Sequence, residues 1–227
     1  FTAVKYDQSK INAKWVGESE RNQERVLAAI LTFAPVLVFI DEIDQKLRRS
    51  EGGDSGVSMR LFGRMLEFMS DPGIRGRVLF VAATNRPDLL DAALKRVGRF
   101  DIKVPFFVPE ADERADIFRV MLNRYANFKW SIKEGQLRKL GADTPGVTGA
   151  EIEGVVVKAT DLAAREESPV EYRHVAKALS LVRRNTADVD FMTAAALLEC
   201  NDLEFVPPKW HDKMDWAQRV FAGRGGE

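Results

Sequence analysis

Two adjacent carboxylates, Asp41 and Glu42, stand at the end of an apolar run over residues 36–40. Five consecutive apolar residues between polar ones are typical of a strand buried on both faces in a parallel sheet. The carboxyl end of such a strand is where ligands of α/β sheets bind. There Asp41 could hold a magnesium ion, largely through water, and Glu42 could activate the water that attacks a γ-phosphate. The same residues could instead cap a following helix, because acidic side chains favour helix N-termini.

An amide and two arginines extend this pattern. Asn85 follows a second apolar run, residues 78–82. If the two runs form neighbouring strands, the amide could orient the same water, although an asparagine at this place could also simply form a turn. Arg96 and Arg99 lie three residues apart around a glycine, so both can project from one loop. An arginine that reaches a γ-phosphate stabilises transition-state charge, but a solvated surface pair would have the same spacing.

In order and spacing, these residues resemble the AAA ATPase family in its narrow sense, within the AAA+ superfamily. The resemblance covers roughly residues 1–185 and rests on five separated motifs. These motifs occupy residues 14–20, 40–44, 83–88, 98–101 and 146–152.

The resemblance implies a role for each matching residue. Asp41 and Glu42 would be the Walker B pair, with Asp41 as the Mg²⁺ ligand and Glu42 as the catalytic carboxylate. Asn85 would be the sensor-1 residue. Arg96 and Arg99 match arginine-finger positions, which act on the nucleotide of a neighbouring subunit. The resemblance therefore implies ATP and Mg²⁺ as cofactors and a homo-oligomer, in this family a hexameric ring.

Two further motifs are assigned by the resemblance. Gly149 and Ala150 match the start of the helix that lies beside the nucleotide. The pore loop, which grips an extended polypeptide in the channel of the ring, matches Lys14, Trp15, Val16 and Gly17. A flat aromatic side chain offers large, sequence-tolerant contact area, and the glycine lets the loop bend. The local sequence alone leaves open that Trp15 is a core residue before a helix, whereas the resemblance favours the pore.

One motif of the family is absent. The 227 residues contain no Gly-Lys dipeptide, so the Walker A loop that cradles the phosphates is missing. Residues 1–4 resemble the strand that follows this loop and its helix. We therefore expect a fragment that lacks the Walker A segment, or a chain that receives it from another chain. We expect the fragment alone to be inactive, since a sheet without its central strand leaves unpaired edges.

The elements that must position these residues alternate along the chain. Apolar runs predict strands over residues 36–40, 78–82 and 102–104, and helical spacing predicts helices over residues 25–34 and 59–69. This alternation predicts an α/β fold. With the resemblance, it is a parallel-sheet AAA+ nucleotide-binding core, incomplete at its N-terminus, followed by a small α-helical lid subdomain.

We expect three parts in the chain. The large α/β subdomain covers residues 1–108 and lacks the first strand and the phosphate loop. The helical lid covers residues 109–185, where helical spacing continues without a convincing strand. Residues 186–227 form a C-terminal extension that carries no motif we can interpret.

Composition limits the other classes of function. Apolar residues make up 45% and charged residues 30%, as in ordinary globular proteins, and the formal net charge is zero. Overall charge therefore gives no support to nucleic-acid binding. The single cysteine, Cys200, excludes an internal disulfide and favours a reducing, cytoplasmic location. No apolar run approaches the roughly 18 residues of a membrane segment.

These observations favour an ATP-hydrolysing ring motor that remodels, unfolds or translocates polypeptide substrates, with adaptor proteins as further partners. One alternative is a scaffold without hydrolysis, which the absent phosphate loop supports and the intact acidic and arginine motifs oppose. Another is a nucleic-acid helicase of the Asp-Glu-x-Asp type. That class has Ser-Ala-Thr where this chain has residues 83–85, Ala-Thr-Asn, and it has a second sheet-containing motor domain.

Overall fold

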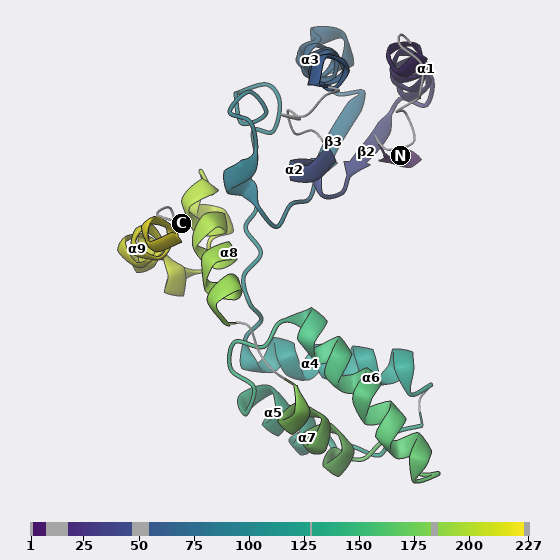
Figure 1. Ribbon diagram of the computed structural model, residues 1–227, viewed down its shortest axis with the longest axis vertical. Coiled ribbons are helices and arrows are strands. Elements are labelled where there is room, and N and C mark those ends of the chain that lie inside the picture. The colour runs from purple at the N-terminus through teal and green to yellow at the C-terminus, as the bar shows by residue number, and fades with distance from the viewer. Residues whose placement is uncertain (1, 8–17, 47–54, 128, 183–185, 225–227) are drawn as a thin grey trace. The chain divides into compact units, whose positions relative to one another are not determined.

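The chain folds into two compact units in the computed structural model (Figure 1). The first unit comprises Phe1–Pro105 and Ala194–Glu227, and the second comprises Phe106–Thr193. The structure describes residues 2–7, 18–46, 55–127, 129–182 and 186–224. In this part of the chain, no helix is both long enough and apolar enough to cross a lipid bilayer.

The first unit contains a parallel sheet in the order β1-β2-β3. Its strands are β1 (Thr2–Tyr6), β2 (Val36–Ile40) and β3 (Val78–Ala82). The last residues of the three strands are aligned, because Tyr6 pairs with Ile40 and Ile40 pairs with Ala82. The carboxyl ends of all three strands therefore meet at one edge of the sheet. This sheet confirms the predicted α/β class with parallel strands.

Helices α1 (Glu18–Thr32) and α3 (Ser55–Ser70) pack on one face of this sheet (Figure 1). Successive side chains of a strand point to opposite faces, and Val36, Val38 and Ile40 of β2 point toward these helices and are wholly buried. Side chains of both helices complete this core. They include Leu27, Ile30, Phe62, Met65, Leu66 and Met69.

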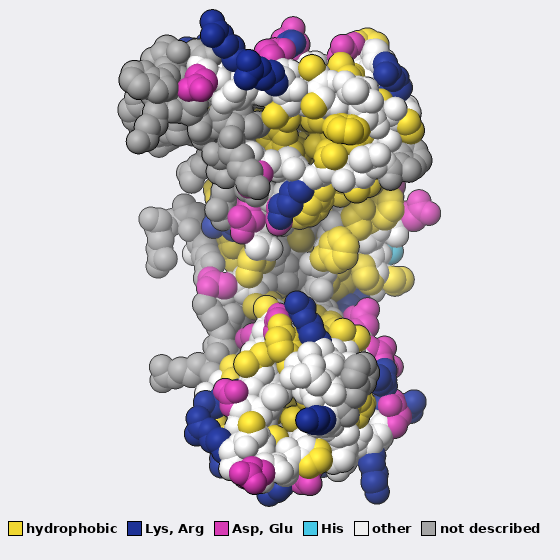
Figure 2. Space-filling model, turned by 90° about the vertical axis from the view of Figure 1, so that its right-hand side faces the viewer, with side chains coloured by type: hydrophobic (Ala, Val, Ile, Leu, Met, Phe, Trp, Pro, Cys, Tyr) yellow, Lys and Arg dark blue, Asp and Glu magenta, His cyan; other side chains and the backbone are white. Residues whose placement is uncertain are grey.

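The opposite face of the sheet is open. Leu37 and Phe39 of β2 are only partly buried there, and the paired residues of β3, Leu79 and Val81, are 55% and 38% exposed. Hydrophobic side chains accordingly reach the surface of this unit between charged ones (Figure 2). The prediction that β2 is buried on both faces is therefore wrong. Among the described residues, helices cover one face only.

The third predicted strand is also wrong. Residues 102–104 lie in a segment without helix or strand. A short apolar run becomes a strand only where its backbone pairs with a neighbouring strand, and residues 102–104 pair with none of the described strands. In the described part of the sheet β3 is an edge strand that pairs with β2 alone. Just before this segment, the Asp101 carbonyl instead accepts a hydrogen bond from Asn201 Nδ2 at 3.0 Å.

The first unit also contains several short elements, the end of α8 (Thr186–Glu199), which begins in the second unit, and α9 (Met214–Arg224). The short elements are α2 (Ile43–Lys46) and the 3₁₀ helices Pro72–Ile74, Pro87–Leu89, Leu203–Phe205 and Pro208–Lys213.

The second unit is helical, as the sequence predicts for this part of the chain. Its helices are α4 (Ala111–Tyr125), α5 (Glu134–Ala142), α6 (Gly149–Arg165) and α7 (Tyr172–Leu181). Each contributes one apolar face to a common core. The core includes Phe118, Leu122, Leu137, Leu140, Ile152 and Val175.

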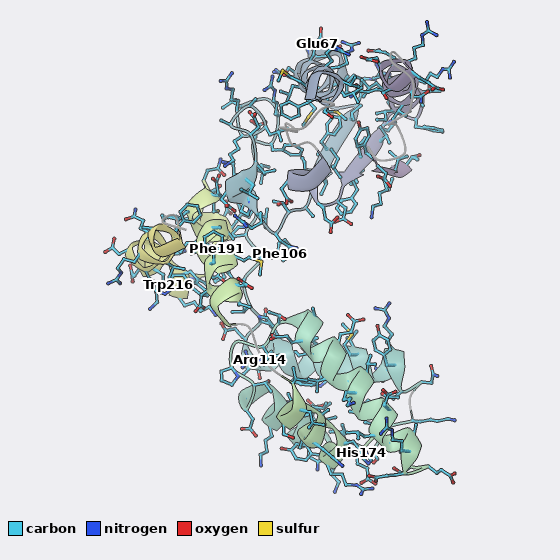
Figure 3. The ribbon with its side chains drawn as sticks, in the orientation of Figure 1. Glu67, Phe106, Arg114, His174, Phe191 and Trp216 are labelled. Atoms are coloured by element: carbon cyan, nitrogen blue, oxygen red, sulfur yellow. The ribbon has the colours of Figure 1, made fainter. Side chains whose placement is uncertain are left out.

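Helices α4 and α5 approach each other closely at Gly141. A Cβ atom at this position would lie 2.1 Å from the carbonyl oxygen of Ala111. The buried guanidinium of Arg114 (Figure 3) donates to the Gly141 carbonyl through Nε at 2.9 Å and Nη2 at 2.7 Å. The absent side chain lets the two backbones meet, and Arg114 satisfies a carbonyl in the last turn of α5 that helical bonding leaves open.

We predict that Gly141→Ala lowers the free energy of unfolding of the helical unit by about 1–3 kcal/mol, because α4 and α5 must move apart to admit the methyl group. Urea unfolding followed by circular dichroism measures the change. Gly154→Ala is the matched control. It lies inside α6 with no atom within 4 Å of the added Cβ, and it should be neutral or stabilising by up to about 1 kcal/mol. Equal stability of the two variants would contradict the close approach.

Candidate active site

The predicted catalytic residues of the sheet lie at one edge. Asp41 and Glu42 follow β2 directly, and Asn85 follows β3 after two intervening residues. Because the strands are parallel and their last residues are aligned, these three residues share the carboxyl edge of the sheet. The ladder continues one step past the strands, where Ala83 N donates to the Ile40 carbonyl at 2.9 Å.

Further hydrogen bonds join the two strand ends. Ile43 N donates to the Ala83 carbonyl at 3.1 Å. The Thr84 hydroxyl donates to Asp44 Oδ1 at 2.5 Å and accepts from Arg86 N at 2.9 Å. Asp44 is only 9% exposed, so its carboxylate depends on partners within the protein. These bonds fix the backbone on both sides of the predicted catalytic positions.

Glu42 adopts an unusual backbone conformation between these fixed points. Its φ is +51°, in the left-handed region that residues other than glycine seldom occupy. Such a conformation costs about 1–3 kcal/mol and persists only where the surroundings impose it. The bonds of Ile40 and Ile43 to Ala83 hold it from either side. The side chain of Glu42 is exposed at the sheet edge, so the strain presents a carboxylate to solvent where a ligand would bind.

The neighbouring carboxylate, Asp41, can accept a cation. Lys5 Nζ lies 3.0 Å from Asp41 Oδ2 and 5.8 Å from the centre of the Phe39 ring. The two charged side chains are 58% and 41% exposed, so this pair contributes little stability and would yield to a divalent ion. In the described part of the chain, no group of three or more His, Cys, Asp or Glu residues could hold a metal. A magnesium ion at Asp41 would take its other ligands from water and phosphate.

Arg96 and Arg99 lie in one tight loop of the first unit, and only Arg96 has an exposed side chain. Arg99 donates from Nε to the Ser70 hydroxyl at 3.0 Å and from Nη1 to the Ala93 carbonyl at 2.6 Å. Gly98 lies between them with φ +88°, a conformation that suits glycine, and its N–H donates to Asp101 Oδ1 at 2.6 Å.

The other predicted site residues lie elsewhere. Gly149 and Ala150 begin α6 in the second unit, where Glu151 N donates to the Thr148 hydroxyl and Thr148 N donates to the Glu151 carboxylate. Their contact with a nucleotide remains a prediction. The predicted pore-loop residues lie outside the described residues, and their role also remains a prediction. They are Lys14, Trp15, Val16 and Gly17.

Asp44 and Thr84 were not predicted as site residues, although both lie inside the motifs at residues 40–44 and 83–88. The signal was present in their positions, because Asp44 follows the Walker B pair and Thr84 precedes Asn85. Parallel pairing of the two strands brings these positions together. The bond between them makes both residues candidates for positioning the catalytic groups.

Comparison with known proteins matches the first part of the chain to a family of ATPases. Residues 1–108 match the family model described as "ATPase family associated with various cellular activities (AAA)". The chain is 35% identical over 146 residues to the human ATPase family gene 2 protein homolog A. The aligned stretch covers 63% of this chain and 16% of that protein. It is 37% identical over 172 residues to the mitochondrial inner membrane m-AAA protease component AFG3L1 of Mus musculus. That stretch covers 74% of this chain and 22% of the mouse protein.

An archaeal protein shows a similar match. The proteasome-activating nucleotidase of Pyrococcus abyssi is 33% identical over 170 residues, which is 73% of this chain and 41% of that protein. The chain thus spans between 16% and 41% of the length of these three relatives.

We predict that Thr84→Val lowers the free energy of unfolding of the first unit by about 1–3 kcal/mol, because it leaves the buried Asp44 carboxylate and Arg86 N–H without the hydroxyl. Thr84→Ser keeps the hydroxyl and serves as the control, with a smaller loss. Denaturant unfolding of both variants against the wild type measures the difference. If Val and Ser substitutions are equally mild, the Thr84–Asp44 bond does not hold the strand ends together.

Proposed function

The chain belongs, over residues 1–108, to the AAA family of ATPases, and on this basis we propose that it forms part of an ATP-hydrolysing ring motor that acts on polypeptides. The single observation that carries the proposal is the strained Glu42, whose carboxylate is presented at the sheet edge shared with Asp41 and Asn85. A strained acidic residue at this edge is suited to chemistry on a bound ligand.

Each residue has a distinct task in the proposed reaction. Asp41 would hold hydrated Mg²⁺, and the ion would polarise the γ-phosphate of ATP. Glu42 takes a proton from the attacking water. The side-chain amide of Asn85 orients that water from the end of the neighbouring strand. The hydrogen bonds at Ala83 and Thr84 keep these groups in place before the substrate binds.

We propose that the phosphate-binding loop is supplied by a segment outside residues 1–227. The open edge of β3 and the exposed Leu79 and Val81 beside it support this proposal, since they offer backbone hydrogen bonds and apolar surface to a further strand. Residues 1–227 by themselves should then bind ATP weakly and turn it over poorly. If no such segment exists, the scaffold without hydrolysis becomes the better interpretation.

Arg96 and Arg99 lead to the proposal of a ring. An arginine stabilises transition-state charge only where it meets a γ-phosphate, and the proposed partner is the nucleotide of an adjacent subunit. We propose a homohexamer on the family resemblance. The relatives' names include a protease component and a proteasome-activating nucleotidase, which supports a polypeptide substrate.

We predict that Glu42→Gln in the whole protein leaves ATP binding nearly unchanged and lowers turnover by about 10²-fold or more, as loss of a general base requires. Phosphate release and titration with a fluorescent nucleotide measure the two quantities. Glu67→Gln is the control, because this carboxylate is exposed on α3 (Figure 3), where it pairs with Arg64. Unchanged turnover in Glu42→Gln would refute the assignment of the base.

The same variant tests whether the arginines act between subunits. Glu42→Gln subunits retain their arginines, and Arg99→Ala subunits retain their carboxylates. A ring that contains both has some interfaces with an intact pair, so mixing two inactive preparations should restore part of the turnover. Mixed rings that stay as inactive as the separate preparations would refute action between subunits.

We predict that Trp15→Ala impairs unfolding of a polypeptide substrate at least about tenfold while basal ATP turnover changes little, because the flat ring supplies the grip on the substrate. Trp15→Phe keeps an aromatic ring and should retain most of the unfolding rate. Both rates are measured on the same preparation, with a fluorescent protein as substrate. Equal loss of both rates in Trp15→Ala would assign Trp15 to the core.

A further inference from the structure

The loop that carries the two arginines has no regular secondary structure of its own. Residues 95–103 form neither helix nor strand, so no helix or sheet ladder fixes their backbone. Their position nevertheless decides where Arg96 and Arg99 point. Local bonds, such as that from Lys95 N to the Ala92 carbonyl at 3.2 Å, hold part of this segment, and further bonds to both of its ends come from residues 199–201, where α8 ends.

Glu199 joins the two ends of the arginine segment. Its Oε1 lies 2.5 Å from Lys95 Nζ, and its Oε2 lies 3.8 Å from Lys103 Nζ. The three side chains are only 21% to 27% exposed, so solvent screens these pairs less than fully exposed ones. Lys95 immediately precedes Arg96, and Lys103 lies four residues beyond Arg99. A single carboxylate therefore connects both ends of the segment that contains the arginines.

The next two residues hold the backbone of the segment. Asn201 Nδ2 donates to the Asp101 carbonyl at 3.0 Å, and the Cys200 thiol, which has a single proton to donate, lies within reach of two carbonyls, that of Lys103 at 3.3 Å and that of Asp202 at 3.2 Å. Asp101 in turn accepts the Gly98 N–H, which lies between the arginines. A continuous path of hydrogen bonds thus runs from Asn201 through Asp101 to the turn at Gly98.

We propose that residues 199–201 are positioning residues for the arginine loop, so that the C-terminal segment sets how well Arg96 and Arg99 reach the neighbouring subunit's γ-phosphate. This inference rests on the proposed function, in which those arginines act between subunits. It assigns a task in the reaction to a part of the chain that carries no recognisable motif. Loss of the anchor should impair the neighbour's site and leave the subunit's own carboxylates intact.

The test begins with Glu199→Gln in the whole protein. The kcat for ATP should fall about ten- to a hundredfold, since a displacement of about 1 Å can cost 10²-fold, and the KM should change less than about threefold because substrate binding is retained. Asp190→Asn is the matched control. It removes an exposed carboxylate from the same helix and should keep the wild-type kcat.

Mixed rings then distinguish a positioning role from a merely structural one. Glu199→Gln subunits have an intact Glu42 and misplaced arginines, so Glu42→Gln subunits, which bring correctly placed arginines, should restore turnover. Arg99→Ala subunits should not restore turnover, because they bring no intact arginine to the mixed interface. If Glu199→Gln fails to form rings, Asn201→Ala replaces it, because this change removes only the hydrogen bond to Asp101, and the same pattern of rescue is expected.

Three results would overturn the inference: a wild-type kcat for both Glu199→Gln and Asn201→Ala, rescue by Arg99→Ala subunits, or rescue by neither partner in folded rings. Failure of the proposed function is recognised separately. In that case the mixture of Glu42→Gln and Arg99→Ala would itself show no recovery, whatever the Glu199 variants do.

Discussion

The hydrogen-bonded join between the carboxyl ends of β2 and β3 is the constraint on which the candidate site depends. Two backbone bonds at Ala83 and the bond between Thr84 and Asp44 continue the parallel ladder beyond the strands. Between these bonds Glu42 has a positive φ, a conformation that costs free energy in residues other than glycine. A looser join would let Glu42 relax to an ordinary conformation and would separate the carboxylates from Asn85.

The sheet that supports this join is covered on one face only. Burial of Val36, Val38 and Ile40 against α1 and α3 supplies its hydrophobic stabilisation, while Leu79 and Val81 stay in contact with water. Exposed apolar residues beside an open strand edge favour association with another segment. The same surface that makes the sheet incomplete is therefore the place where a phosphate-binding segment would both stabilise the fold and complete the site.

Sequence patterns predicted the parts of the fold that local spacing determines. The apolar runs that became β2 and β3, and the helical spacing of α1, α3 and the second unit, each depend on neighbouring residues alone. Residues 102–104 have the same kind of apolar run, yet they form no strand, because their backbone pairs with none of the described strands. Whether both faces of β2 are covered likewise depends on other segments, which a single apolar run does not reveal.

The same distinction applies to the site. Asp41, Glu42 and Asn85 were predictable because each directly follows or lies near the end of an apolar run. The link from Glu199 to Lys95 spans 104 residues, and no local pattern marks it. In a loop without its own secondary structure, such distant contacts add to local bonds such as Gly98 to Asp101, and together they limit the conformational entropy that would spread the arginines over many positions. Order in the arginine loop is thus a property of the folded unit, and residues 199–201 contribute to it from outside the motifs of the predicted site.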